Sequence, residues 1–307
     1  MSKASATDIQ QSITDQVIEI LSSGEVPPWK KPWTGMGGAM PFNFSTNAPY
    51  NGVNILILWL AAMKMEYSSN AWMTFKQAKA LGGSVRKGEK GVKCIFFKPL
   101  LIEQGDDEKD DVFVPCRRVF TLFNLDQVDG LESNGTTVIE PAEPDLQAQT
   151  VIDQMNRYCQ AEGISVTRHP DTAGYSVMGD SIVLPSSKSF FTPGDEAVTF
   201  AHEVVHATGH PSRLGRMKSS ESTQGIRKGT PEYAFEELVA ELGASFICAA
   251  MGVEGQLVQH ASYIDSWLEA LGKDKSLVAK AAAAASKAHA LILPPQLEDE
   301  PEEKLVA

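Results

Sequence analysis

The segment HEVVH at 202–206 constrains this chain more than any other part of its 307 residues. Side chains four positions apart share a face of an α-helix, so His202 and His206 can bind one metal ion while Glu203 reaches a water molecule beside it. Residues 194–196 can begin a helix and Gly209 can end it. The segment therefore predicts a helix with two metal ligands and Glu203 as the catalytic base. Two solvent-facing histidines on a purely structural helix are the alternative.

A catalytic zinc site needs a third protein ligand and one open position. The longer motif HExxHxxGxxH would supply a third histidine, but Ser212 stands at that position. The segment FEELVAEL at 235–242 is the better source, because Glu237 and Glu241 are four residues apart and can face the metal helix together. We assign Glu237 as the third ligand of zinc, or of another divalent metal, and Glu241 as the carboxylate that orients a ligand histidine. Glu236 is the competing choice for the third ligand.

Such a site is typical of peptide-bond hydrolysis. Zinc lowers the pKa of its bound water to about 7 and polarises a carbonyl group, while Glu203 passes the proton to the leaving amine. We expect residues 180–185, just before the metal helix, to form an edge strand that aligns an extended peptide. The sequence does not rank four candidates for stabilising the transition state: Tyr233, Tyr263, His210 and Arg213.

The distribution of charge points to a second function. The formal net charge of −12 argues by itself against a nucleic-acid partner. Residues 26–100, however, hold ten lysines and arginines against two acidic residues, together with four of the five tryptophans. Cations neutralise phosphates, and each base that stacks on an aromatic ring contributes about 1–3 kcal/mol. The sequence therefore predicts single-stranded DNA contacts by Trp29, Lys30, Lys31, Trp33, Lys79, Arg86, Lys87 and Lys90.

Alternatives to this interpretation concern the aromatic and the basic residues separately. Trp59 lies in an apolar run and is expected in the core, whereas Trp29 and Trp33 are as consistent with a core position as with surface recognition. A protein-binding role for the same basic segment is the remaining alternative.

Composition places the chain in a broad class. The hydrophobic fraction of 43% and the charged fraction of 21% are those of a globular protein. The four cysteines form no CxxC pair, which indicates reduced thiols in a cytoplasmic protein. The chain shows no secretory h-region and no apolar run near the roughly 20 residues of a membrane span, so we expect no membrane partner.

The pattern of apolar residues predicts two domains of the α+β class. We place a first domain at 1–130, a linker at 131–147, a second domain at 148–295 and an acidic disordered tail at 296–307. The expected elements of the first domain are helices at 7–22, 51–65 and 74–81 and strands at 93–101 and 112–124. Thr7 is expected to cap the first helix, and the alanine-rich stretch 276–291 to form a surface helix.

Several stretches carry a resemblance to a known family. In the first domain they are PWKKPW (28–33), YNGVNILILW (50–59), AWMTFKQAKALGGSVRKGEKGVKCIFFKP (71–99) and VFTLFNLDQVDGL (119–131). In the second they are SIVLPSSKSF (181–190), FAHEVVHATGHPSRLGR (200–216) and YAFEELVAELGASF (233–246). The first set resembles the N-terminal domain of ArdC-like antirestriction proteins, and the second resembles the zincin-type metallopeptidase domain of the same family.

The resemblance implies a plasmid- or phage-borne protein with a single-stranded-DNA-binding domain, followed by a zincin-like domain with a small sheet and an active-site helix. Such a protein would protect incoming DNA from restriction during conjugation. The ExxAE pattern after HExxH also resembles gluzincin-type peptidases, which supports Glu237 by its position. Two hypotheses remain. Either the metal site cleaves a host restriction-system protein on the DNA, or DNA masking alone protects and the metal site is structural or vestigial.

Overall fold

The computed structural model of the protein describes residues 5–24, 40–102, 112–131, 144–217, 230–253 and 261–294. The predicted DNA contacts Trp29, Lys30, Lys31 and Trp33 lie outside these ranges. So do residues 132–143 of the predicted linker and all of the predicted acidic tail. No helix among the described residues is both long enough and apolar enough to cross a membrane.

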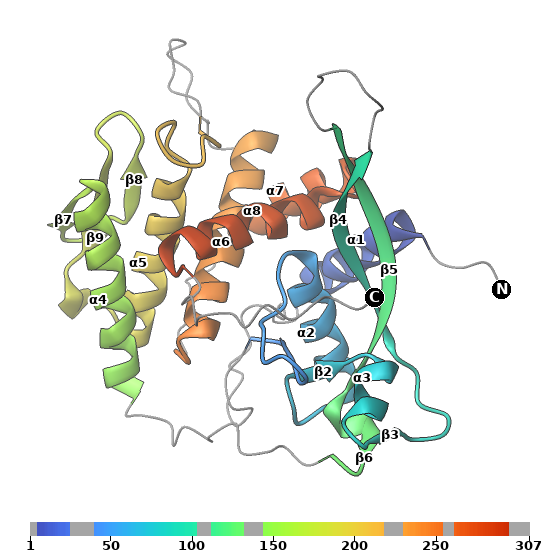
Figure 1. Ribbon diagram of the computed structural model, residues 1–307. Helices are drawn as coiled ribbons and strands as arrows, with labels where there is room; N and C mark the ends of the chain where they lie inside the picture. The colour runs from blue at the N-terminus through green and yellow to red at the C-terminus, as the bar shows by residue number, and fades with distance from the viewer. Residues whose placement is uncertain are drawn as a thin grey trace.

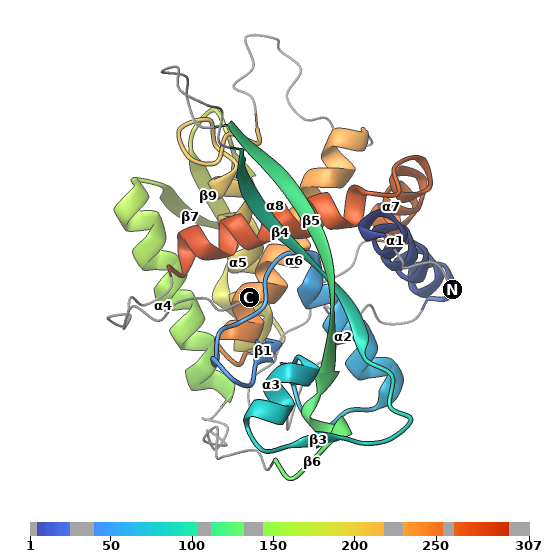
Figure 2. The same cartoon turned by 45° about the vertical axis from the view of Figure 1, so that its right-hand side comes forward.

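The N-terminal part combines helices with two small sheets (Figure 1). Its elements are α1 (Ala6–Ser23), β1 (Phe42–Asn43), α2 (Val53–Met65), β2 (Ala71–Met73), α3 (Phe75–Ala80), β3 (Ser84–Val85), β4 (Val92–Ile102), β5 (Val112–Asn124) and β6 (Val128–Asp129). The larger sheet has the order β1-β2-β5-β4, and β3 pairs with β6. The antiparallel strands β4 and β5 form the long twisted ribbon that crosses the front of Figure 2.

The residue that caps the start of α1 is not the predicted one. The N-cap is Ser5, whose hydroxyl accepts the backbone N–H of Asp8, while the Asp8 carboxylate accepts the backbone N–H of Ser5. This reciprocal pair satisfies two N–H groups that the first turn of a helix otherwise leaves unpaired. Thr7, which we expected to be the cap, is therefore already inside the helix.

The C-terminal part is mainly helical, with one small sheet. Its elements are α4 (Pro144–Glu162), β7 (Ser165–His169), β8 (Gly174–Ser176), β9 (Ser181–Pro185), α5 (Pro193–Thr208), α6 (Pro231–Ala250), α7 (Ala261–Lys273) and α8 (Leu277–Ile292). The strand order is β7-β9-β8, with β9 parallel to β7 and antiparallel to β8. The edge-strand prediction for 180–185 is therefore wrong, because β9 pairs on both sides; β8 lies at the edge beside α5.

One face of the alanine-rich helix α8 is buried in the core and the other is exposed, so α8 is more deeply packed than the predicted surface helix. Its inward face is formed by seven buried residues: Val278, Ala279, Ala281, Ala282, Ala285, Ala288 and Ile292. Alanine side chains are short, so α8 can lie close across α6, as Figure 1 shows. The high helix propensity of alanine favours the helix, but it does not say which side faces water.

One continuous hydrophobic core joins the two parts of the chain. Nearly all of α2 is buried, and the ring of Trp59 lies 5.7 Å from that of Phe246 on α6, centre to centre. The core position expected for Trp59 is confirmed. Asn54 of α2 also exchanges two hydrogen bonds with the backbone of Ile95 in β4. The helix α2 thus connects the β4–β5 ribbon to the helices of the C-terminal part.

Candidate metal centre

Local sequence fixes the start of α5, which carries HEVVH. The hydroxyl of Thr192 accepts the backbone N–H of Asp195, the Asp195 carboxylate accepts the backbone N–H of Thr192, and Pro193 occupies the first turn. Phe200 and Val204 are fully buried and hold the helix in the core. The predicted metal helix is thus observed in full, with its end at Gly209.

The structure brings His202, His206 and Glu237 together, although Glu237 lies on a different helix, α6. The two Nε2 atoms are 3.1 Å apart, and each lies 3.6 Å from one carboxylate oxygen of Glu237. A tetrahedral metal with bonds near 2.0–2.2 Å separates its ligand atoms by about 3.3 Å. All three side chains are buried, and their ligand atoms lie within 4.8 Å of one another. These residues therefore fit a divalent metal ion.

The electrostatics of the cluster also favour a cation. Burial acts to raise the pKa of the Glu237 carboxyl, but hydrogen bonding to His202 and the nearby His206 hold it at about 2. Burial acts to lower the pKa of His202, but Glu237, Glu203 and Glu241 together raise it to about 9. The raised pKa of His202 reflects negative charge that has accumulated around this point and favours a compensating positive charge. A divalent cation can take over that compensating role.

Glu203 lies beside the ligand histidines and next to the edge strand β8. It is buried, and burial raises the pKa of its carboxyl above the ordinary glutamate value. The backbone of Tyr175, in β8, hydrogen-bonds to it. A carboxylate with a raised pKa is suited to accept a proton and then release it to a leaving group.

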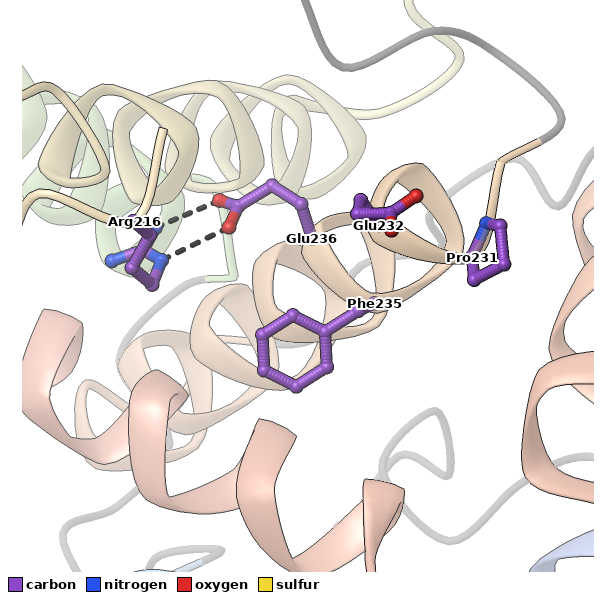
Figure 3. A pocket seen from close by; sticks show the side chains of 5 residues that line it. All are labelled: Arg216, Pro231, Glu232, Phe235 and Glu236. Carbon is purple, nitrogen blue, oxygen red and sulfur yellow. Dashed lines mark hydrogen bonds and ion pairs between the residues drawn. The ribbon is translucent and has the colours of Figure 1, made fainter. Parts of the chain in front are cut away.

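Two further carboxylates of α6 lie next to the ligand histidines. Glu241 is buried, and its charge contributes to the raised pKa of His202. Its assignment as the orienting carboxylate stays a prediction. Glu236 instead faces the other histidine, with its Oε1 atom 3.4 Å from Nδ1 of His206. Glu236 also accepts two hydrogen bonds from Arg216, beside a pocket of about 290 Å³ (Figure 3).

The four candidates for transition-state stabilisation are now distinguishable. The side chain of Tyr233 hydrogen-bonds to the candidate ligand Glu237, which places it at the candidate metal centre. Arg213 is instead buried in an ion pair with Asp180, and His210 lies within 2.7 Å of the Ser212 hydroxyl. The side chain of Tyr263 lies outside the described side chains.

The predicted DNA contacts that the structure describes lie in or next to α3, β3 and β6, at the lower end of Figure 1. Lys79, Lys87 and Lys90 are exposed. Arg86 forms ion pairs with Glu89 and Asp129, so part of its charge is already neutralised. The three lysines form no ion pair with another described residue, whereas Arg86 also holds the loop to β6.

Sequence reasoning missed two side chains. Phe75, the first residue of α3, is 56% exposed and makes an edge contact with Phe123 beside the exposed Lys79. Its position between the helix cap Thr74 and Lys76 could have indicated an exposed aromatic side chain next to positive charge. Arg216 ends the stretch HPSRLGR, and nothing in its local spacing points to Glu236, which is 20 residues away.

Comparison with known proteins matches both parts of the chain. Residues 7–123 match the family model for the N-terminal domain of anti-restriction factor ArdC, and residues 153–284 match that for a zincin-like metallopeptidase. Two crystal structures of the antirestriction protein ArdC from plasmid R388 are similar at 36% identity over 93% of this chain. The metal-free one has a TM-score of 0.71 and is covered to 96%, and the Mn(II)-bound one has 0.70 and is covered to 97%.

Relatives are also found among the curated proteins. The uncharacterized protein y4eC of Sinorhizobium fredii is 33% identical over 92% of this chain and 90% of its own length. The DNA primase TraC of Escherichia coli is 34% identical over 92% of this chain, which spans 27% of that primase. These likenesses confirm the predicted resemblance and the α+β, two-domain class.

Proposed function

This chain belongs to the ArdC antirestriction family, and on that premise we propose that it binds single-stranded DNA with its N-terminal part and hydrolyses peptide bonds with its C-terminal part. The proposed setting is the cytoplasm of a cell that receives plasmid DNA by conjugation. The proposed outcome is protection of that DNA from host restriction. A host restriction-system protein bound to the entering strand is the proposed substrate.

The convergence of His202, His206 and Glu237 around one point, with Glu203 alongside, is the observation that carries the catalytic half of this proposal. A zinc ion held by the three ligands would supply Lewis-acid polarisation of a carbonyl group and acidify a water molecule. Glu203 would accept the proton of the attacking water and deliver it to the leaving amine. Its burial, which raises its pKa, supports both steps.

The edge strand β8 supports a peptide substrate. It pairs with β9 on one side only, among the described strands, and the backbone of its central residue Tyr175 contacts Glu203. An extended peptide added beside β8 would form main-chain hydrogen bonds within reach of the catalytic carboxylate. The side chain of Tyr233 forms a hydrogen bond with Glu237. We assign its hydroxyl to stabilising the transition state.

The exposed lysines and Phe75 support the DNA-binding half. Lys79, Lys87 and Lys90 would neutralise phosphates, and the exposed ring of Phe75 would stack on a base. The tryptophans and lysines of 29–33, assigned from the sequence, would add further stacking and phosphate contacts. Each phosphate contact with a single strand lowers log K by about 0.7 per tenfold rise in salt.

The two halves are tested by two sets of variants. Glu203→Gln keeps the ligand set, so we expect it to bind Mn²⁺ and DNA normally but to lose protection of a plasmid transferred into a restricting host. Normal protection by this variant would refute proteolysis as the mechanism and leave DNA masking. Replacing Lys79, Lys87 and Lys90 with alanine should reduce the salt slope of oligonucleotide binding by about 2. Alanine at the exposed lysines Lys188, Lys273 and Lys287, far along the chain, is the control and should leave the slope unchanged.

A further inference from the structure

His206 and His202 differ in how their second ring nitrogens are held. Nδ1 of His206 lies 3.4 Å from Oε1 of Glu236, a carboxylate that is only 3% exposed. Nδ1 of His202 is buried and has no hydrogen-bond partner among the described residues. The two ligand histidines of HEVVH are therefore supported unequally, and His206 is the one whose ring has a fixed neighbour.

Glu236 is itself held by the guanidinium of Arg216. Nε of Arg216 donates to one carboxylate oxygen at 3.0 Å, and Nη2 donates to the other at 2.8 Å. This two-point geometry fixes the plane of the carboxylate as well as its position. Figure 3 shows both bonds between the loop after α5 and the helix α6.

Arg216 also donates hydrogen bonds to α5, the helix that carries HEVVH. Its Nη2 donates to the backbone carbonyl of Val205 at 2.7 Å, and its Nη1 donates to the hydroxyl of Thr208 at 2.9 Å. The same guanidinium thus joins the last turn of α5 to the carboxylate of α6. A lysine has a single ammonium group and cannot make this set of bonds.

The tautomer of a ligand histidine decides whether it can bind a metal. Coordination through Nε2 requires the proton to be on Nδ1, and an acceptor at Nδ1 secures that arrangement. Oε1 of Glu236 lies 3.4 Å from Nδ1 of His206, which places it where that acceptor is needed. The carboxylate of Glu236 lies between Nδ1 of His206 and the guanidinium of Arg216.

We propose that Arg216 is a positioning residue for the metal centre, which acts through Glu236 to hold His206 with its proton on Nδ1 and its Nε2 toward the metal. The inference rests on the metal site of the proposed function. It assigns Glu236 to orienting His206 and not to the third-ligand role for which the sequence made it a competitor.

The test compares Arg216→Lys and Glu236→Gln with Arg213→Lys. Arg213 is the matched control, because it is a buried arginine of the same loop whose ion pair, with Asp180, does not touch a ligand histidine. Titration calorimetry with Mn²⁺ alone should show affinity about 10–100-fold weaker for the first two variants and unchanged for the control. Equal affinity in Arg216→Lys and the wild type, or an equal loss in the control, would overturn the proposal.

A spectroscopic measurement on the metal-free protein separates positioning from general stability. Long-range ¹H–¹⁵N spectra of the histidine rings should show the Nδ1–H tautomer for His206 in the wild type and a mixture in Glu236→Gln. A wild-type His206 protonated on Nε2 alone would refute the inference, even where a variant fails to fold. If the wild type binds no Mn²⁺, the proposed function fails, while the tautomer of His206 still decides this inference.

Discussion

Replacing Gly243 with alanine tests whether close contact between α5 and α6 sets the metal geometry. A Cβ atom at Gly243 would lie 2.8 Å from both Cγ atoms of Val205, which stands between the two ligand histidines in HEVVH. Ordinary contact begins at 3.4 Å, so the added methyl group requires the helices to separate by about 0.6 Å. That shift exceeds the roughly 0.5 Å within which a functional site must be held.

The expected magnitudes follow from two opposing effects. Overpacking of a core costs about 1–3 kcal/mol, whereas alanine in place of a helical glycine contributes about 0.5–1 kcal/mol. We therefore expect Gly243→Ala to lower the free energy of unfolding by about 0.5–2 kcal/mol. We also expect it to weaken Mn²⁺ binding about tenfold, since Glu237 moves with α6 while both histidines stay on α5.

Urea unfolding and calorimetric Mn²⁺ titration measure the two effects. Gly272→Ala on α7 is the control, because nothing lies within 4 Å of its added Cβ, and it should leave Mn²⁺ binding unchanged. Adding Val205→Ala to Gly243→Ala restores the space and should recover most of the metal affinity. If Gly243→Ala binds Mn²⁺ as well as the wild type does, or if the second change recovers nothing, helix spacing does not set the site.

Three other parts of the fold can be tested by substitution and urea unfolding. Ala285→Leu on the buried face of α8 should lower the free energy of unfolding by about 1–3 kcal/mol. The control Ala283→Leu, on the exposed face, should change it by less than about 0.5 kcal/mol. Similar effects at both positions would contradict the burial of that face of α8. Glu66 ends α2 in the left-handed backbone region, with φ 53°. Its replacement by glycine should raise the free energy of unfolding by about 0.5 kcal/mol. A decrease would argue against the left-handed backbone at this position. Hydrogen bonds from Lys280 and Ser276 hold the pKa of Asp274 at about 2, below the ordinary 3.8, so its contribution is present above pH 3.8 and is lost as the pH falls toward 2. The stability difference between the wild type and Asp274→Asn should therefore shrink over that interval, and a constant difference would refute the assignment.

Features that depend on neighbouring residues could be predicted from the sequence. The spacing in HEVVH fixes which side chains share a face, and the structure places both histidines on one side of α5. The short helix expected at 74–81 is observed as α3, because Thr74 and Gln77 cap each other within four residues. The ribbon of β4 and β5 follows from two apolar runs with acidic residues between them in the sequence.

Features that depend on distant parts of the chain could not be predicted in this way. The partner of Arg216 lies on another helix, and no periodicity links the two residues. The strand β9 is central because it pairs with β7 as well as with β8. The local sequence of β8 and β9 does not reveal the pairing with β7. The alanine face of α8 is equally compatible with water and with a close-packed neighbour, so only the presence of α6 decides between them.

The position of α2 limits how this family can exchange its parts. By sequence α2 belongs to the N-terminal domain, yet Trp59 packs on Phe246 and the backbone N–H of Gly52 donates to Ser286 of α8. A chimera that combines this N-terminal half with the C-terminal half of a relative would join two incomplete surfaces. In this chain the two parts share the surface around α2, so a transplant that keeps these contacts has to move both parts together.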